Sequence, residues 1–101
     1  MTHVTGLRFE WDERKNAENQ RKHGVSFGEA ETVFLDEFAL LIDDPDHSSH
    51  EQRFILLGIS ARLRHLVVCH CYRTSGTLIR IISARKATAP ERKAYQERWN
   101  R

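Results

Sequence analysis

The sequence predicts an α+β protein in which two N-terminal helices and one C-terminal helix pack against an antiparallel β-sheet. Three observations support this class. Helix-capping signals occur twice near the N-terminus and once near the C-terminus, apolar strand-like runs fill the middle of the chain, and short turn sequences separate those runs. The predicted order of elements is β-α-α-β-β-β-β-α. A length of 101 residues suits a single domain spanning residues 1–101.

The N-terminal part of the chain predicts one strand and two helices. Residues 7–11 alternate enough for a short strand. Asp12 is an N-cap, because its carboxylate can accept hydrogen bonds from the free N–H groups of a helix that ends at residues 23–24. Ser26 begins the second helix, and Glu29 has the spacing of a capping box.

The middle and C-terminal parts predict four strands and the last helix. The four apolar runs cover residues 38–42, 52–59, 65–73 and 77–85. The connections between the last three are short, so these strands form an antiparallel meander. A capping box at Thr88 and Glu91, with Pro90 in the first turn, opens a helix that runs to Trp99.

Arg80 lies inside an apolar run, where an unpaired guanidinium is costly to bury. If residues 74–76 form the preceding loop, His70 lies opposite Arg80, but a loop one residue shorter pairs Arg80 with Cys71 instead. Two interpretations stay open. Arg80 either pairs with a carboxylate on a hydrated face, or presents its donors to a phosphate. His70 is either a satisfied core histidine or a functional one.

Composition and charge exclude several protein classes. The chain is 40% hydrophobic and 30% charged, which is typical of a folded globular protein. Its net charge is only +2, but basic residues concentrate in the C-terminal third, which could face phosphates or simply form a solvated surface. There is no glycine-rich phosphate loop, serine nucleophile elbow or carboxylate pair at a recognisable spacing, so most common enzyme classes are excluded.

No metal, cofactor or membrane is predicted. Cys69 and Cys71 share one strand face, which favours free thiols in a reducing compartment over a disulfide, and supplies too few ligands for a zinc site. The polar segment 46–51 matches no ligand spacing and is interpreted as a connection. No apolar run is long enough for a bilayer and no secretion signal is visible, so we expect a cytoplasmic protein.

Three motifs in order resemble the BrnT toxin family, over roughly residues 8–99. The N-terminal motif comprises Phe9, Glu10, Trp11, Asp12, Lys15, Asn19, Lys22, His23, Gly24, Val25, Ser26, Phe27, Glu29, Ala30, Val33 and Phe34. The central acidic-x-Arg motif is Glu51, Gln52 and Arg53, preceded by His50 where the family usually has glycine. The C-terminal motif comprises residues 79–87 with Glu91, Arg92 and Tyr95.

The resemblance implies a RelE-like fold and a ribonuclease toxin of a type II toxin–antitoxin system, which cleaves RNA and so inhibits translation and growth. It also implies a BrnA-like antitoxin that neutralises the toxin, and contact with promoter DNA only through the toxin–antitoxin complex. We expect this antitoxin to cover the active surface or to dock on an edge strand.

Our hypothesis is a metal-independent endoribonuclease in which the RNA 2′-hydroxyl attacks the adjacent phosphate. The expected catalytic residues are Arg53, Arg80 and Arg85 on one sheet face, with His23 or His70 moving protons. The expected substrate-binding residues are Lys22, Tyr72 and Lys86. Two alternatives stay open: a non-catalytic module of the same fold that binds nucleic acid or protein, and a structural partner whose C-terminal helix docks an acidic protein.

Overall fold

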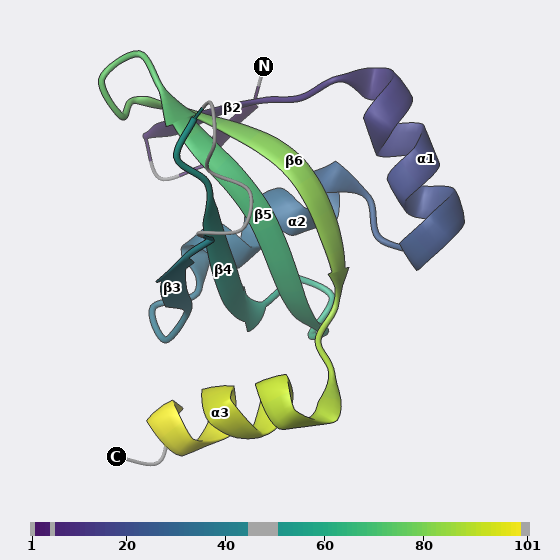
Figure 1. Cartoon of the computed structure of the whole chain (residues 1–101), viewed down its shortest axis with the longest axis vertical. Coiled ribbons are helices and arrows are strands. Elements are labelled where there is room, and N and C mark those ends of the chain that lie inside the picture. The colour runs from purple at the N-terminus through teal and green to yellow at the C-terminus, as the bar shows by residue number, and fades with distance from the viewer. Residues whose placement is uncertain (1, 5, 45–50, 100–101) are drawn as a thin grey trace.

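The computed structural model describes residues 2–4, 6–44 and 51–99 and shows a six-stranded mixed sheet with three α-helices (Figure 1). The strand order across the sheet is β1-β2-β6-β5-β4-β3. The elements are β1 (Thr2–Val4), β2 (Leu7–Glu10), α1 (Glu13–His23), α2 (Phe27–Thr32), the 3₁₀ turn η1 (Val33–Leu35), β3 (Leu40–Asp43), β4 (Phe54–Ile59), β5 (His65–Arg73), β6 (Leu78–Lys86) and α3 (Ala89–Trp99). The predicted connection at residues 46–50, including His50, lies outside the described residues.

The α+β class and the three helices are confirmed, but the sheet is not purely antiparallel. Strands β4 to β6 form the expected antiparallel meander, and β3 extends it by pairing antiparallel with β4. Strand β2 instead runs parallel to β6, with Phe9 opposite Ile79, and β1 adds a hairpin strand on its outer side. The predicted order therefore lacked its first strand. Local periodicity carries no information on a partner so distant in the chain, and β1 is only three residues long.

The helices begin and end at the predicted capping residues. The Asp12 carboxylate accepts from the backbone N–H groups of Arg14 and Lys15 at 2.8 and 3.3 Å, and the chain leaves α1 through Gly24 at a φ of 68°. At α3 the capping box is complete, because Thr88 N donates to Glu91 Oε1 at 2.8 Å and Glu91 N donates to Thr88 Oγ1 at 3.3 Å.

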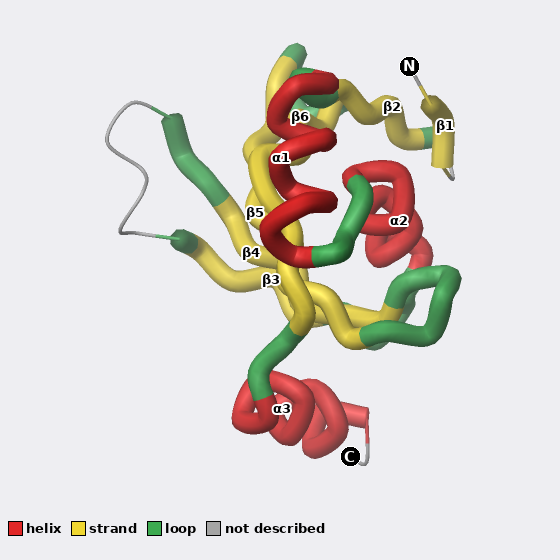
Figure 2. Tube along the Cα trace, turned by 90° about the vertical axis from the view of Figure 1, so that its right-hand side faces the viewer, coloured by secondary structure: helices red, strands yellow, loops and turns green. Residues whose placement is uncertain are grey.

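The main core lies between the sheet and α2, on the face away from the viewer in Figure 1, and α1 lies beside the outer edge of β6 (Figures 1 and 2). Its buried side chains are Phe9, Val25, Phe27, Ala30, Val33, Leu56, Leu66, Val68, Ile79, Ile81 and Ala84. We call this face of the sheet the helix-covered face.

Helix α3 covers only one end of the opposite face. There, Tyr95 packs with Leu57, Val67 and Ala87, and its hydroxyl donates to Asp36 Oδ2 at 2.6 Å. The rest of this face carries no helix in the described part of the chain (Figure 2). We call it the open face, and it is where a ligand can reach the strands.

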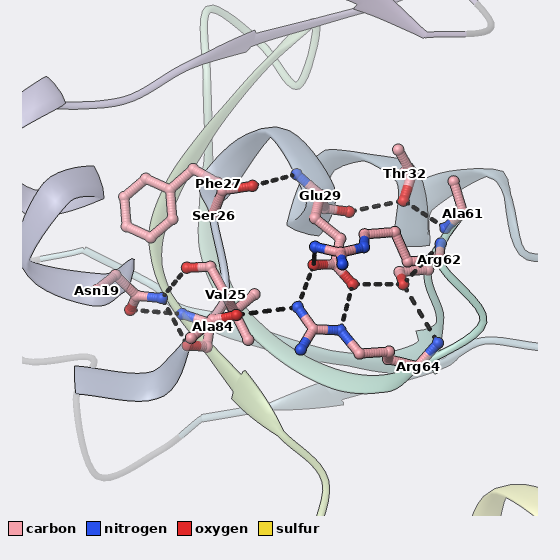
Figure 3. A network of polar contacts seen from close by, with 12 residues as sticks. Asn19, Val25, Ser26, Phe27, Glu29, Thr32, Ala61, Arg62, Arg64 and Ala84 are labelled. Carbon is pink, nitrogen blue, oxygen red and sulfur yellow. Dashed lines mark hydrogen bonds and ion pairs between the residues drawn. The ribbon is translucent and has the colours of Figure 1, made fainter. Parts of the chain in front are cut away.

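An ion pair between the buried Glu29 and the partly exposed Arg64 joins α2 to the turn between β4 and β5 (Figure 3). Glu29, at 8% exposure, receives two hydrogen bonds from the Arg64 guanidinium, and its Oε2 accepts from Ser60 Oγ at 2.7 Å. The same arginine donates to the carbonyl of Gly24 at 3.0 Å. These hydrogen bonds hold the pKa of Glu29 below its usual value. Glu29 therefore does not complete the predicted capping box with Ser26, whose hydroxyl caps the helix alone.

Candidate active site

A β-bulge places two arginines of β6 on the open face. The register pairs Cys71 with Arg80, Cys69 with Ser83 and Val67 with Arg85, and it shifts by one residue between Cys69 and His70. On a regular strand, residues five apart point to opposite faces. Because Ile82 is the extra residue in β6, Arg80 and Arg85 both lie on the face of Cys69 and Cys71.

The predicted pairing of His70 with Arg80 is wrong. The loop between β5 and β6 contains four residues, 74–77, rather than the three expected, and its first three members have positive φ angles of 53°, 56° and 86°. The longer loop moves the register by one residue, so Cys71 faces Arg80 and His70 faces Ile81. Simple alternation also gives the wrong strand faces beyond Ile81, because the bulge at Ile82 shifts the following residues by one position.

Arg53 and Arg85 line one cavity of about 390 Å³ on the open face. Its other lining residues are His23, Asp44, Ile55, Val67, Cys69, Ile82, Ser83 and Ala84. Arg53 precedes β4, and its carbonyl accepts from Asp44 N at 2.9 Å, which extends the pairing of β3 with β4. Asp44 is 9% exposed, so this cavity contains a carboxylate that the sequence analysis did not single out. We call it the arginine cavity.

A chain of alternating charges runs along the same face. Arg80 Nη1 lies 2.9 Å from Glu10 Oε2, which lies 3.6 Å from Arg73 Nε. The Arg73 guanidinium is 3.4 Å from Glu51, and Glu51 is 3.8 Å from Arg53 Nε. At that distance Arg53 Nε is not hydrogen bonded, and it is a buried donor without a partner in the described structure. Among the described arginines of the open face, Arg53 therefore carries a buried donor that no protein group satisfies.

Arg85 is fixed by a two-point contact with α3. Its Nη1 and Nη2 donate to the two carboxylate oxygens of Glu91 at 2.8 and 3.0 Å. This pair and the capping contact with Thr88 lower the pKa of Glu91 to about 2, so Glu91 stays ionised. Arg85 thus holds a rigid position, with part of its charge already neutralised.

Helix α1 brings His23 and Lys22 to the rim. His23 is exposed at the last residue of α1 and lines the arginine cavity, while Lys22 lines a smaller adjacent cavity. Lys86 is exposed at the end of β6, next to Arg85 in sequence, but its backbone pairs with Leu66 and its side chain does not line either cavity. The structure thus brings His23 together with Arg53 and Arg85.

His70 and Tyr72 lie on the helix-covered face, apart from the arginines. The His70 ring is fully buried, 4.9 Å from the Phe34 ring, with Nδ1 3.2 Å from the Val68 carbonyl oxygen. Burial lowers the pKa of His70 to about 4, so the ring is neutral near pH 7. Its Nε2 lies 3.3 Å from the hydroxyl of Tyr72, which is 39% exposed. The structure therefore favours the interpretation of His70 as a satisfied core histidine.

Neither thiol is set up as a strong nucleophile or ligand. Cys69 and Cys71 are free thiols on the open face, and burial raises the pKa of both. His70 points to the other face, so the three neighbours do not converge. Among the described residues, no group of three or more potential ligands is arranged around a common metal position. None of the described helices is long and apolar enough to cross a membrane.

The chain matches a known protein family and resembles a solved structure. Residues 11–91 match the family model described as ribonuclease toxin, BrnT, of type II toxin-antitoxin system. The chain is also similar to a solved structure, the ribonuclease toxin BrnT of Brucella abortus, with a TM-score of 0.62 and 23% sequence identity over 81% of this chain and 97% of that one. At this identity, the structural match bears on the fold alone. The comparison with curated proteins finds no significant match.

Proposed function

Because the chain belongs to the BrnT family of ribonuclease toxins of type II toxin–antitoxin systems, we propose that it is an endoribonuclease whose active site is the arginine cavity. One observation carries the proposal. Arg53, Arg85 and His23, from three separate segments of the chain, line a single cavity on the open face of the sheet. Cationic donors and an exposed imidazole are groups that can support RNA cleavage without a metal.

In the proposed reaction, the RNA 2′-oxygen attacks the adjacent phosphorus while the bond from phosphorus to the 5′-oxygen breaks. The 2′-hydroxyl loses a proton and the leaving 5′-oxygen gains one, which gives a 2′,3′-cyclic phosphate and a 5′-hydroxyl end. Negative charge on the phosphoryl oxygens increases in the transition state. Guanidinium donors placed around it therefore stabilise the transition state more than the bound substrate.

We assign the main phosphate contact to Arg53, since its Nε has no hydrogen-bond partner in the described structure. Arg85, held rigidly by Glu91, adds a fixed charge on the same cavity, and Arg80 binds a neighbouring phosphate further along the open face. His23 is the proton-transfer group, because it is exposed on the cavity rim whereas His70 is buried on the other face. Lys22 and Lys86 are assigned to the RNA backbone, and Tyr72 to a contact outside the cavity.

Family membership also supports a partner antitoxin. We propose that it is BrnA-like, that it neutralises the toxin in the cytoplasm, and that promoter DNA is bound only by the complex. The relation of this fold to the RelE toxins belongs to the same proposal, and rests on the motifs rather than on the sheet order.

The test is incubation of the purified protein with total RNA in excess EDTA, alongside Arg53→Ala, Arg80→Ala and His23→Ala. Lys93→Ala is the matched control, since Lys93 is an exposed cation of α3. We expect fragments from the wild type and the control, and at least about tenfold slower cleavage by each of the other variants. Near-normal cleavage by folded Arg53→Ala contradicts its assigned role. If folded wild type binds RNA without cutting it, and salt weakens this binding, the protein is a binding module instead.

A further inference from the structure

A second hollow of about 240 Å³ adjoins the arginine cavity, between α1 and β6. It is lined by Lys15, Glu18, Asn19, Lys22, His23, Ile82 and Ser83. The last three of these residues also line the arginine cavity, so the two hollows are continuous around the edge of β6. We call the second one the α1–β6 groove. An RNA strand bound in the arginine cavity has a path into it.

Asn19 fixes the wall of this groove, because its side chain makes backbone hydrogen bonds with β6 that a neighbouring strand would otherwise make. Strand β2 pairs with β6 only at residues 78–80, which leaves the following part of that edge without a strand partner in the described chain. The Asn19 side-chain amide fills this role at Ala84, donating to its carbonyl at 2.8 Å and accepting from its N–H at 3.1 Å. It also donates to the Val25 carbonyl at 2.8 Å (Figure 3). Helix α1 is thereby held at a defined position beside β6.

The groove differs from the arginine cavity in its charges. Lys15 and Lys22 are seven residues apart on one face of α1, and Glu18 lies between them. Each arginine of the open face has a carboxylate partner, but no ion pair engages Lys15, Lys22 or Glu18 among the described residues. Two unpaired ammonium groups therefore line the path of the strand, with one acceptor-only carboxylate between them.

We propose that the α1–β6 groove binds the nucleotide next to the cleaved phosphodiester bond, and that Glu18 makes this position selective for guanine. The proposal rests on the proposed ribonuclease function. Lys15 and Lys22 hold the phosphate beyond the scissile one. Guanine is the base whose Watson–Crick edge places two N–H donors side by side, which a carboxylate accepts at two points. Adenine, cytosine and uracil each present an acceptor there, which Glu18 repels.

The test uses DNA oligonucleotides that contain a single ribonucleotide, so that cleavage by 2′-hydroxyl attack is confined to one bond. The base on each side of that bond is varied in turn, and cleavage is followed in excess EDTA. We expect guanine to be preferred on one side of the bond. There, wild type should cut the oligonucleotide with guanine about tenfold faster than those with the other three bases. In Glu18→Gln this advantage falls to within about twofold, whereas Glu97→Gln, a carboxylate change on exposed α3, retains it.

The same oligonucleotides with a 2′-O-methyl group at the ribonucleotide cannot be cut, and fluorescence anisotropy then measures binding alone. A guanine preference in binding that Glu18→Gln abolishes supports the groove even if no RNA is cleaved, in which case only the nuclease assignment fails. Cleavage with equal rates for all four bases overturns the groove and leaves the nuclease assignment intact. A preference that Glu18→Gln retains also overturns it.

Discussion

The buried imidazole of His70 predicts a specific loss of stability in weak acid. In the folded protein its pKa is about 4, against an ordinary value of 6.5, because burial disfavours the charged ring. The unfolded chain therefore binds a proton between these two values that the folded chain does not. Stability must then fall as the pH decreases through this window, and it is unaffected by His70 above it.

The size of the effect follows from the two pKa values. Lowering the pH from about 7.5 to about 5 should cost the wild type about 2 kcal/mol through His70 alone, at about 1.4 kcal/mol for each unit of separation. In His70→Gln this contribution disappears. The variant should be less stable than wild type at the higher pH, because the close packing against Phe34 is lost, but its stability should change less on acidification.

Urea denaturation of both proteins at the two pH values measures this difference. The comparison between variants cancels the effects of other groups, including Glu31, whose pKa burial raises, and which acts in the opposite direction. Equal losses of stability in wild type and His70→Gln would refute the reasoning. They would mean that solvent reaches the ring in the folded state, so that burial does not disfavour its charged form.

Two further predictions concern contacts that support the site. Arg64→Met should lower the free energy of unfolding by about 2 kcal/mol, because the buried Glu29 carboxylate loses the guanidinium that donates to it and keeps only Arg62, at 4.0 Å. The ion pair holds the pKa of Glu29 below its usual value, so the difference in stability between wild type and Arg64→Met should shrink below about pH 4 as the carboxyl is protonated. Urea denaturation at neutral pH and below about pH 4 measures this difference. A difference that stays constant would contradict the reasoning. Gly58→Ala should cost about 1–3 kcal/mol in thermal or urea unfolding, because its new Cβ would lie 2.9 Å from Asp36 Oδ2 and 3.0 Å from Val33 Cγ1, and unchanged stability would show that η1 can move.

The features predicted correctly from the sequence are those that depend on a few neighbouring residues. Asp12, Ser26 and the pair Thr88 and Glu91 act as helix caps in the structure, because a cap is defined by side chains and N–H groups within four positions of each other. Strand β5 has the predicted limits, since its apolar run is long and ends at polar residues on both sides.

The features that sequence reasoning missed depend on distant parts of the chain or on one residue of register. The parallel pairing of β2 with β6 joins Phe9 to Ile79, and nothing near either residue identifies the other. The four-residue loop and the bulge at Ile82 each shift the alternation of β6 by one position. Arg80 and Arg85 lie on one face, as expected, although residues five apart on a regular strand point to opposite faces.

In the candidate site, too, the sequence predicted the residue types but not the surroundings that the fold gives them. The importance of Arg53, Arg80 and Arg85 was suggested by motifs, which record residue types without their surroundings. Their carboxylate partners at Glu10, Glu51 and Glu91 come from β2, the approach to β4 and α3, and only the fold brings them together. His70 was a candidate because histidine titrates near neutral pH, but burial removes that property.

The pairing of these arginines with carboxylates reconciles the small net charge of +2 with the proposed binding of RNA, which is a polyanion. An unpaired cluster of guanidinium groups on one sheet face would repel itself in the free protein and destabilise the fold. Alternating carboxylates remove that cost, and they hold the arginine forks in fixed positions before RNA arrives. A phosphate must then compete with Glu51 for Arg53, a contact of 3.8 Å that is the longest in the chain of charges along the face. The longest ion pair along the face therefore involves the arginine to which we assign the scissile phosphate.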